Sequence, residues 1–199
     1  MNILLFFCLP FLLIVPTSFN YKHTDPVINY LNTDEIIKFN KKEYKLAYSS
    51  HPVSNYYMQE YIPKNETLDR YEHMILVDYL LIDTPAANII GVKINEIKER
   101  KKTDMVANYE LVENKETKEY ILDFLLSSSK YLTVNVIEWN GYHYKNYTDK
   151  AGHKGVLLFG VSERAYDGGV TWYLKTLKGH RFDWIKELSL HNFPNIQVN

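Results

Sequence analysis

The stretch EYILDFLLSSSKYLTVNV, residues 119–136, decides the fold class of this chain. Aromatic or aliphatic residues occupy every second position before the serines: Tyr120, Leu122, Phe124 and Leu126. A period of two is typical of a strand with one buried face. Ser127-Ser128-Ser129 predicts a turn, after which Leu132, Val134 and Val136 resume the same alternation. The stretch therefore predicts two antiparallel strands that are neighbours in one sheet.

The same period continues on both sides of this stretch. Further strands are predicted over residues 106–113 and 156–165, and the strand after the serines is expected to run past Trp139 towards Tyr144. Polar links at 114–117 and 146–155 separate the strands. Because such links are short, the four strands are predicted to form an antiparallel meander.

The N-terminal half predicts a mixture of strands and helix. Strands are expected over 43–51 and 55–62, and one over 75–82. Residues 35–39 predict a helical turn, and Thr67 is expected to cap a short helix.

Two longer helices are predicted from their start signals. Thr84 is expected to be the N-cap of the first and Pro85 its first helical residue, with the charged run 98–102 at its end. Asp167-Gly168-Gly169 opens the second, which is expected to be interrupted near Gly179. The predicted fold class is therefore α+β, an antiparallel β-sheet meander flanked by helices.

The N-terminus predicts export. An apolar run over residues 3–15 is too short for a bilayer span, and small residues follow it at Thr17 and Ser18, as in a secretory signal peptide. An uncleaved N-terminal anchor is the alternative. The expected organisation is a signal peptide over 1–18, a leader over 19–42, a single α+β domain over 43–190 and a tail over 191–199. The expected location is periplasmic or secreted.

Composition limits the possible functions. The chain has 199 residues, 46% hydrophobic and 24% charged, with a formal net charge of -1. This near-neutral balance argues against a nucleic-acid partner. The one cysteine, Cys8, lies inside the apolar run, so cleavage would leave no thiol chemistry and no Cys-based metal site. No cofactor is expected.

One segment resembles a known fold family. A Tyr-rich strand pair over residues 44–61 leads into Ile62-Pro63-Lys64-Asn65-Glu66-Thr67-Leu68, and the chain closes with strands and a helix. This order resembles bacterial exported proteins with the Mog1/PsbP-like fold over roughly residues 43–190. The resemblance implies an α/β/α sandwich around an antiparallel sheet and an accessory or binding role. The segment 84–102 departs from the family, and no motif residue for its known roles is present.

Two groups of residues are candidate sites. His143, Asp149 and His153 flank the predicted loop between two strands, and a hairpin could gather them as metal ligands; exposed loop residues are the alternative. Trp139, Tyr142 and Tyr144 lie at the predicted end of the longest strand, where exposed aromatics would mark a binding surface. The alternative is that Trp139 belongs to the core and that the tyrosines pack on the sheet.

A third candidate is a pair of carboxylates, and three functions are compatible with the sequence. Asp123 and Glu138 could meet across strands for glycoside chemistry, but a solvated sheet face is the preferred interpretation. The preferred function is a non-enzymatic binding or accessory module of the bacterial cell envelope. Its expected partner is a protein or a small-molecule ligand, with the membrane met only through the N-terminal signal. A metal-assisted hydrolase using His143 and His153 and a structural envelope component are the alternatives.

Overall fold

The computed structural model describes residues 27–130 and 133–198. Its elements in chain order are β1 (Ile36–Phe39), β2 (Lys42–Val53), β3 (Tyr56–Ile62), β4 (His73–Leu80), α1 (Ala86–Arg100), β5 (Asn108–Asn114), β6 (Glu119–Lys130), β7 (Thr133–Thr148), β8 (Lys154–Tyr166), the 3-10 turn η1 (Asp167–Gly169) and α2 (Val170–Leu190). The predicted signal peptide, its cleavage position, Cys8 and Leu132 lie outside the described residues. Among the described residues, neither helix is long and apolar enough to cross a membrane.

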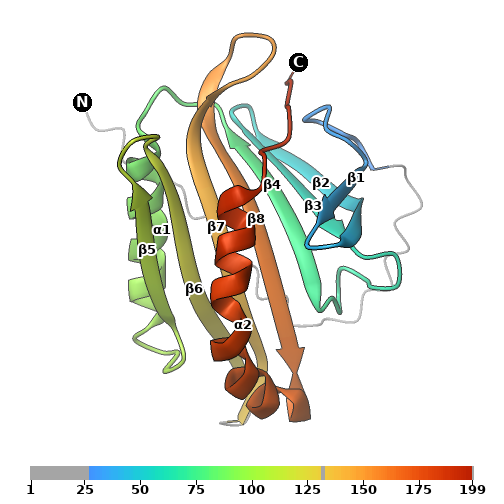
Figure 1. Cartoon of the computed structure of the whole chain (residues 1–199), viewed down its shortest axis with the longest axis vertical. Coiled ribbons are helices and arrows are strands. Elements are labelled where there is room, and N and C mark those ends of the chain that lie inside the picture. The colour runs from blue at the N-terminus through green and yellow to red at the C-terminus, as the bar shows by residue number, and fades with distance from the viewer. Residues whose placement is uncertain (1–26, 131–132, 199) are drawn as a thin grey trace.

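The strands form one antiparallel sheet in the order β1-β2-β3-β4-β8-β7-β6-β5 (Figure 1). Strands β5 to β8 make the predicted meander, and β1 to β4 make a second one. The two meanders meet along a single ladder, in which His73 to Leu80 of β4 pair with Glu163 to Val156 of β8. The predicted α+β class with an antiparallel sheet is therefore confirmed.

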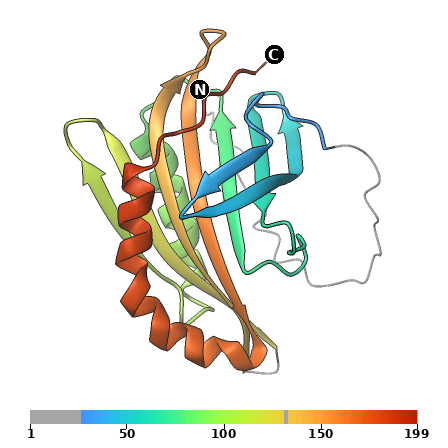
Figure 2. The same ribbon diagram turned by 45° about the vertical axis from the view of Figure 1, so that its right-hand side comes forward.

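The two helices cover opposite faces of this sheet (Figure 2). On the face that we call the α2 face, α2 buries Tyr173, Leu177 and Trp184 against side chains such as Trp139 and Phe159. On the opposite α1 face, α1 packs on the alternate residues of the same strands. This alternation follows from the two-residue period of a strand.

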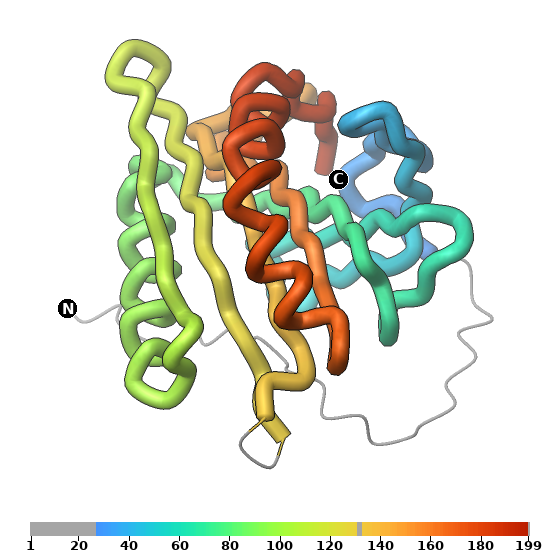
Figure 3. The backbone as a smooth tube through the Cα atoms, turned by 60° about the horizontal axis from the view of Figure 1, so that its bottom comes forward, coloured from blue at the N-terminus to red at the C-terminus, as the bar shows by residue number. Residues whose placement is uncertain are grey.

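The N-terminal strands curl over the α2 face. A two-residue turn, Asn40-Lys41, joins β1 to β2 with φ angles of 45° and 63°, as a tight hairpin requires. The curl brings the Phe39 ring to 5.9 Å from Phe159 and 5.7 Å from Trp184. Figure 3 shows these strands close to the C-terminal tail, whose residue Gln197 donates its backbone N–H to the carbonyl of Leu31. The described parts of both predicted flanks, residues 27–42 and 191–198, thus join the folded unit, because β1 lies inside the first and Ile196 and Val198 of the second are buried.

Several local predictions were wrong. Within the predicted helical turn over 35–39, Ile36–Phe39 form strand β1 instead, because Ile37 and Phe39 alternate towards the core. Residues 67–70 form a tight bridge and no helix, and β4 begins at His73. Thr84 does not cap α1; Pro85 occupies the cap position.

Other errors concern where strands and helices end. Ser127 to Ser129 belong to β6. The predicted loop over 146–155 is shorter in the structure, since β7 runs to Thr148 and β8 starts at Lys154. Helix α2 passes through Gly179 without interruption.

Candidate functional site

The aromatic candidates lie inside the molecule. Trp139, Tyr142 and Tyr144 are 1%, 7% and 4% exposed, because β7 continues beyond them and does not end near Tyr144. Trp139 faces α2, whereas the two tyrosines face α1. Burial raises the pKa of both tyrosines well above its usual value. The structure therefore gives these three residues packing contacts and does not gather them on an exposed surface.

The metal candidates are separated into two places. Asp149 and His153 come together at the turn between β7 and β8, with Nδ1 of His153 3.1 Å from Oδ2 of Asp149. His143 lies six residues earlier in β7, about 20 Å along an extended strand. The described part of the chain contains no group of three His, Cys, Asp or Glu that could hold a metal ion.

His143 and Asp149 each have structural partners. The ring of His143 lies between Oε2 of Glu119 at 3.1 Å and the carbonyl of Leu188 at 3.3 Å. Burial lowers the pKa of His143, although the Glu119 carboxylate opposes the shift. Burial would raise the pKa of Asp149, but backbone N–H groups of Val198 and His153 and the His153 ring hold it below its usual value. Asp149 thus fixes the turn and the C-terminal tail.

The carboxylates Asp123 and Glu138 do not form a pair. Asp123 bonds the indole of Trp139 on the α2 face, whereas Glu138 lies on the α1 face with Arg164 and the hydroxyl of Tyr71. Both are buried, at 3% and 5% exposure, so the predicted solvated sheet face was wrong. Burial of these carboxylates is possible because each has a buried or half-buried arginine partner.

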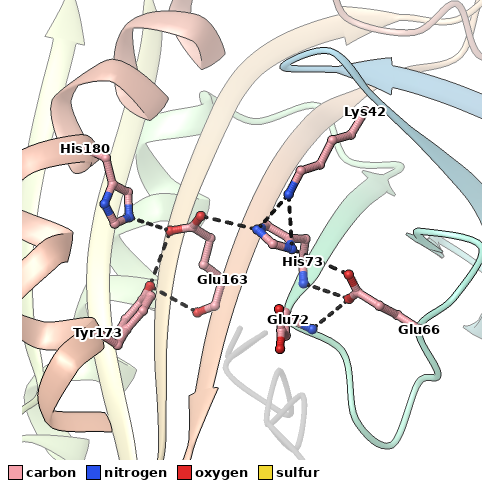
Figure 4. A network of polar contacts seen from close by, with 7 residues as sticks. All are labelled: Lys42, Glu66, Glu72, His73, Glu163, Tyr173 and His180. Atoms are coloured by element: carbon pink, nitrogen blue, oxygen red, sulfur yellow. Dashed lines mark hydrogen bonds and ion pairs between the residues drawn. The ribbon is translucent and has the colours of Figure 1, made fainter. Parts of the chain in front are cut away.

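A polar network on the α2 face joins residues that are far apart in the sequence (Figure 4). Its centre is Glu163 of β8, whose side chain is 8% exposed. Nε2 of His180 on α2 donates to one carboxylate oxygen at 3.0 Å, and Nε2 of His73 on β4 lies 3.6 Å from the other. Tyr173 of α2 also donates to Glu163, through contacts of 3.3 Å and 3.4 Å. No lysine or arginine among the described residues pairs with Glu163, so two histidines are its basic partners.

The network continues from His73 to the sheet edge. Nζ of Lys42 lies 3.1 Å from Nε2 of His73, and Glu66 accepts the backbone N–H groups of Glu72 and His73 at 2.6 Å and 2.9 Å. The ring of Trp184 stacks on His73 with centroids 6.0 Å apart. The two histidines contact different oxygens of Glu163, so the arrangement is a chain of contacts and not a cage. It ties α2 to β2, β4 and β8.

Two further carboxylates, Glu60 of β3 and Asp78 of β4, lie on the α1 face, beside the part that α1 covers. Burial, reinforced by the carboxylate of Asp78, raises the pKa of Glu60 to about 7. Burial raises the pKa of Asp78 to about 6, although the Tyr56 hydroxyl, 2.7 Å away, favours its ionised form. The other oxygen of Asp78 has no hydrogen-bond partner among the described residues. Burial thus favours the protonated form of both groups relative to the same groups in water.

The outer side of α2 carries an exposed stripe of large apolar and basic residues. Positions three or four apart share one side of a helix. One such series, which we call the outer α2 stripe, contains Trp172, Lys175, Gly179, Phe182, Lys186 and Leu190. Trp172, Phe182 and Leu190 are 70%, 64% and 71% exposed. Residues of this size are usually buried, so the stripe is the most accessible apolar feature of either helix.

The two sites differ in how visible they are in the sequence. The outer α2 stripe has a helical spacing that is readable in the sequence, as has the inward series through Leu177, Trp184 and Leu188. The network around Glu163 has no local signal, because the pairing of β4 with β8 creates it.

Comparison with known proteins gives one family match. A protein family matches residues 31–193, from the segment before β1 to the tail after α2. No curated protein matches the chain significantly. The relationship to the Mog1/PsbP-like proteins stays a prediction. Because the match covers most of the 199 residues, this chain belongs to that uncharacterised family.

Proposed function

We propose that this protein is a non-enzymatic binding module of the bacterial cell envelope, reached through export. The observation that carries the proposal is the exposure of Trp172 and Phe182 on the outer α2 stripe, at 70% and 64%. Exposed tryptophan and phenylalanine side chains on one side of a helix lose solvent contact favourably when a partner covers them. The apolar run over residues 3–15 supports the export step.

The sheet supports this role as a rigid platform. Helix α2 is fixed from beneath by Tyr173, Leu177, Trp184 and Leu188, and laterally by the contact of His180 with Glu163. A helix held in this way can present its outer side without moving. Helices on both faces of an antiparallel sheet also support our proposal that the fold is related to the Mog1/PsbP-like sandwich.

A capture experiment tests the proposal. The full chain is immobilised and exposed to envelope extracts, membranes and metabolite pools, and retained species are identified by mass spectrometry. The double variant Trp172→Ala/Phe182→Ala should lose a species that the wild-type chain retains. Because both side chains are exposed, the variant should keep the circular dichroism spectrum and unfolding midpoint of the wild type.

A matched control separates the surface from general stickiness. Met105 is 99% exposed and lies between α1 and β5, so Met105→Ala removes an exposed apolar side chain elsewhere. It should retain every species. Equal retention by all three proteins would contradict the choice of α2 as the binding surface.

A further inference from the structure

We propose that the outer α2 stripe binds an anionic lipid bilayer surface, which names the partner class of the proposed function and rests on it. This inference changes the expectation that the chain meets a membrane only through its N-terminal segment.

The stripe has the length and composition of a helix face that lies flat on a membrane. From Trp172 to Leu190 it extends about 27 Å along the helix axis. Large apolar side chains at both ends and in the middle could enter the boundary between headgroups and acyl chains. Tryptophan favours this boundary in particular, since its ring is apolar and its N–H is polar.

Lysines are interleaved with these apolar residues. Lys175 and Lys186 belong to the stripe, and Lys178 lies on its flank. All three are exposed, and none takes part in an ion pair with another described residue. Asp183 and Glu187 lie together on the opposite flank. Long lysine side chains can extend from a buried helix face to phosphate groups, so the charges complement an anionic surface.

The same charges disfavour a second copy of this chain as the occupant. If two stripes met face to face, Lys175 and Lys186 of each copy would be buried in the contact without a carboxylate on the stripe to pair with them. The two best-formed cavities of the described residues lie near Asp83 and Asn146, and no residue of α2 lines either of them. A flat anionic surface fits the stripe better than a second copy or a small ligand.

Trp172 provides an intrinsic probe of this contact. The other two tryptophans, Trp139 and Trp184, are 1% and 7% exposed, so a change in exposed tryptophan emission reports Trp172. The full chain is mixed with vesicles of phosphatidylcholine containing about one third phosphatidylglycerol, and separately with phosphatidylcholine alone. The apolar N-terminal run contains no tryptophan, so its own interaction with lipid does not produce this signal.

We expect the emission to shift to shorter wavelength with the anionic vesicles, and brominated acyl chains to quench it. Lys175→Gln/Lys186→Gln should reduce the lipid partition coefficient about ten- to thirtyfold, and added salt should reduce it further. Phe182→Ala should reduce it about tenfold. The controls Met105→Ala and Lys98→Gln/Lys101→Gln, which lie outside α2, should partition as the wild type does.

The results distinguish this inference from the function on which it rests. An unshifted Trp172 emission, or equal partition of wild type and stripe variants, would overturn the lipid assignment. If Trp172→Ala/Phe182→Ala nevertheless abolishes capture of an envelope protein, the proposed function stands with a protein partner. If neither assay responds to the stripe variants, both proposals fail.

Discussion

The indole Nε1 of Trp139 donates a hydrogen bond of 2.7 Å to Oδ1 of Asp123 on the neighbouring strand, and both residues are buried. The other carboxylate oxygen lies 2.5 Å from the guanidinium of Arg181, which reaches down from α2. Burial raises the pKa of Asp123, and the indole and Arg181 oppose this shift. The carboxylate therefore connects the sheet with the helix that carries the exposed stripe.

Arg181→Met should destabilise the protein by about 2–4 kcal/mol at neutral pH, because it leaves the buried Asp123 charge without a cation. Urea unfolding followed by circular dichroism measures the change. The matched control is Glu110→Gln, since Glu110 also pairs with Arg181 but is 61% exposed. Its loss should cost less than about 1 kcal/mol. Similar losses of unfolding free energy in both variants would show that the contact of Arg181 with Asp123 stabilises the protein no more than its contact with Glu110.

The stability of the protein should depend on Glu60. Its pKa is about 7 in the folded chain, against an ordinary value of 4.5, so the folded state binds the proton more tightly than the unfolded state does. Stability from this group is present below pH 4.5 and is lost as the pH rises towards 7. Glu60→Gln should therefore stabilise the chain by about 1–3 kcal/mol near pH 8 and by almost nothing near pH 4.

Unfolding free energies measured across this pH range check the prediction. The control Glu43→Gln alters an exposed carboxylate on β2 that pairs with Lys38. We expect it to change stability by a few tenths of a kcal/mol, without the rise towards alkaline pH. A pH-independent effect of Glu60→Gln would contradict the raised pKa.

Two glycines should respond in opposite directions to alanine. A Cβ at Gly155 would lie 2.5 Å from the backbone oxygen of Leu80 and 2.7 Å from the Tyr79 ring. Gly155→Ala should thus destabilise the β4–β8 ladder by about 2–4 kcal/mol. At Gly179, in the middle of α2, a Cβ meets nothing within 4 Å, so Gly179→Ala should stabilise the protein by about 0.5–1 kcal/mol. Thermal unfolding midpoints that moved in the same direction would disagree with this packing.

Loss of the Glu163 carboxylate should weaken the attachment of α2. Glu163→Leu removes the acceptor for His180 and one acceptor for Tyr173, and we expect a cost of about 1–3 kcal/mol in urea unfolding. Glu72→Gln is the control, because Glu72 enters the network only through its backbone N–H. It should unfold as the wild type does. A neutral Glu163→Leu would mean that the Glu163 carboxylate contributes nothing to holding α2 on the sheet.

The fold class was accessible from the sequence because its signals are local. The alternation through Leu122 and Phe124 predicted β6, and Pro85 marked the start of the helix that became α1. Strand β1, Ile36–Phe39, was missed since four residues carry too few periods to separate a strand from a helical turn. Leu68 and Tyr71 occur at helical spacing by coincidence, and they pack in a small cluster with Ile62 and Met74 instead.

Less of the candidate sites than of the fold could be predicted from the sequence. Trp139 and Tyr142 are aromatic and close together in the sequence. In a strand, however, odd-numbered and even-numbered residues face opposite sides of the sheet. The spacing of residues in a strand does not show that Asp123 pairs with an arginine, because Arg181 lies on a helix 58 residues later in the chain. Such contacts follow from strand order and helix placement, which local periodicity does not determine.

The single ladder between β4 and β8 has a consequence for how the molecule reaches its folded state. Ile75 must find Val161, more than eighty residues along the chain, before either meander gains its neighbour. Closing so large a loop is slow compared with forming local hairpins, so this search should set the rate of folding. Until it succeeds, each half has an unpaired edge, and the corresponding strand of another molecule is the natural competitor for it.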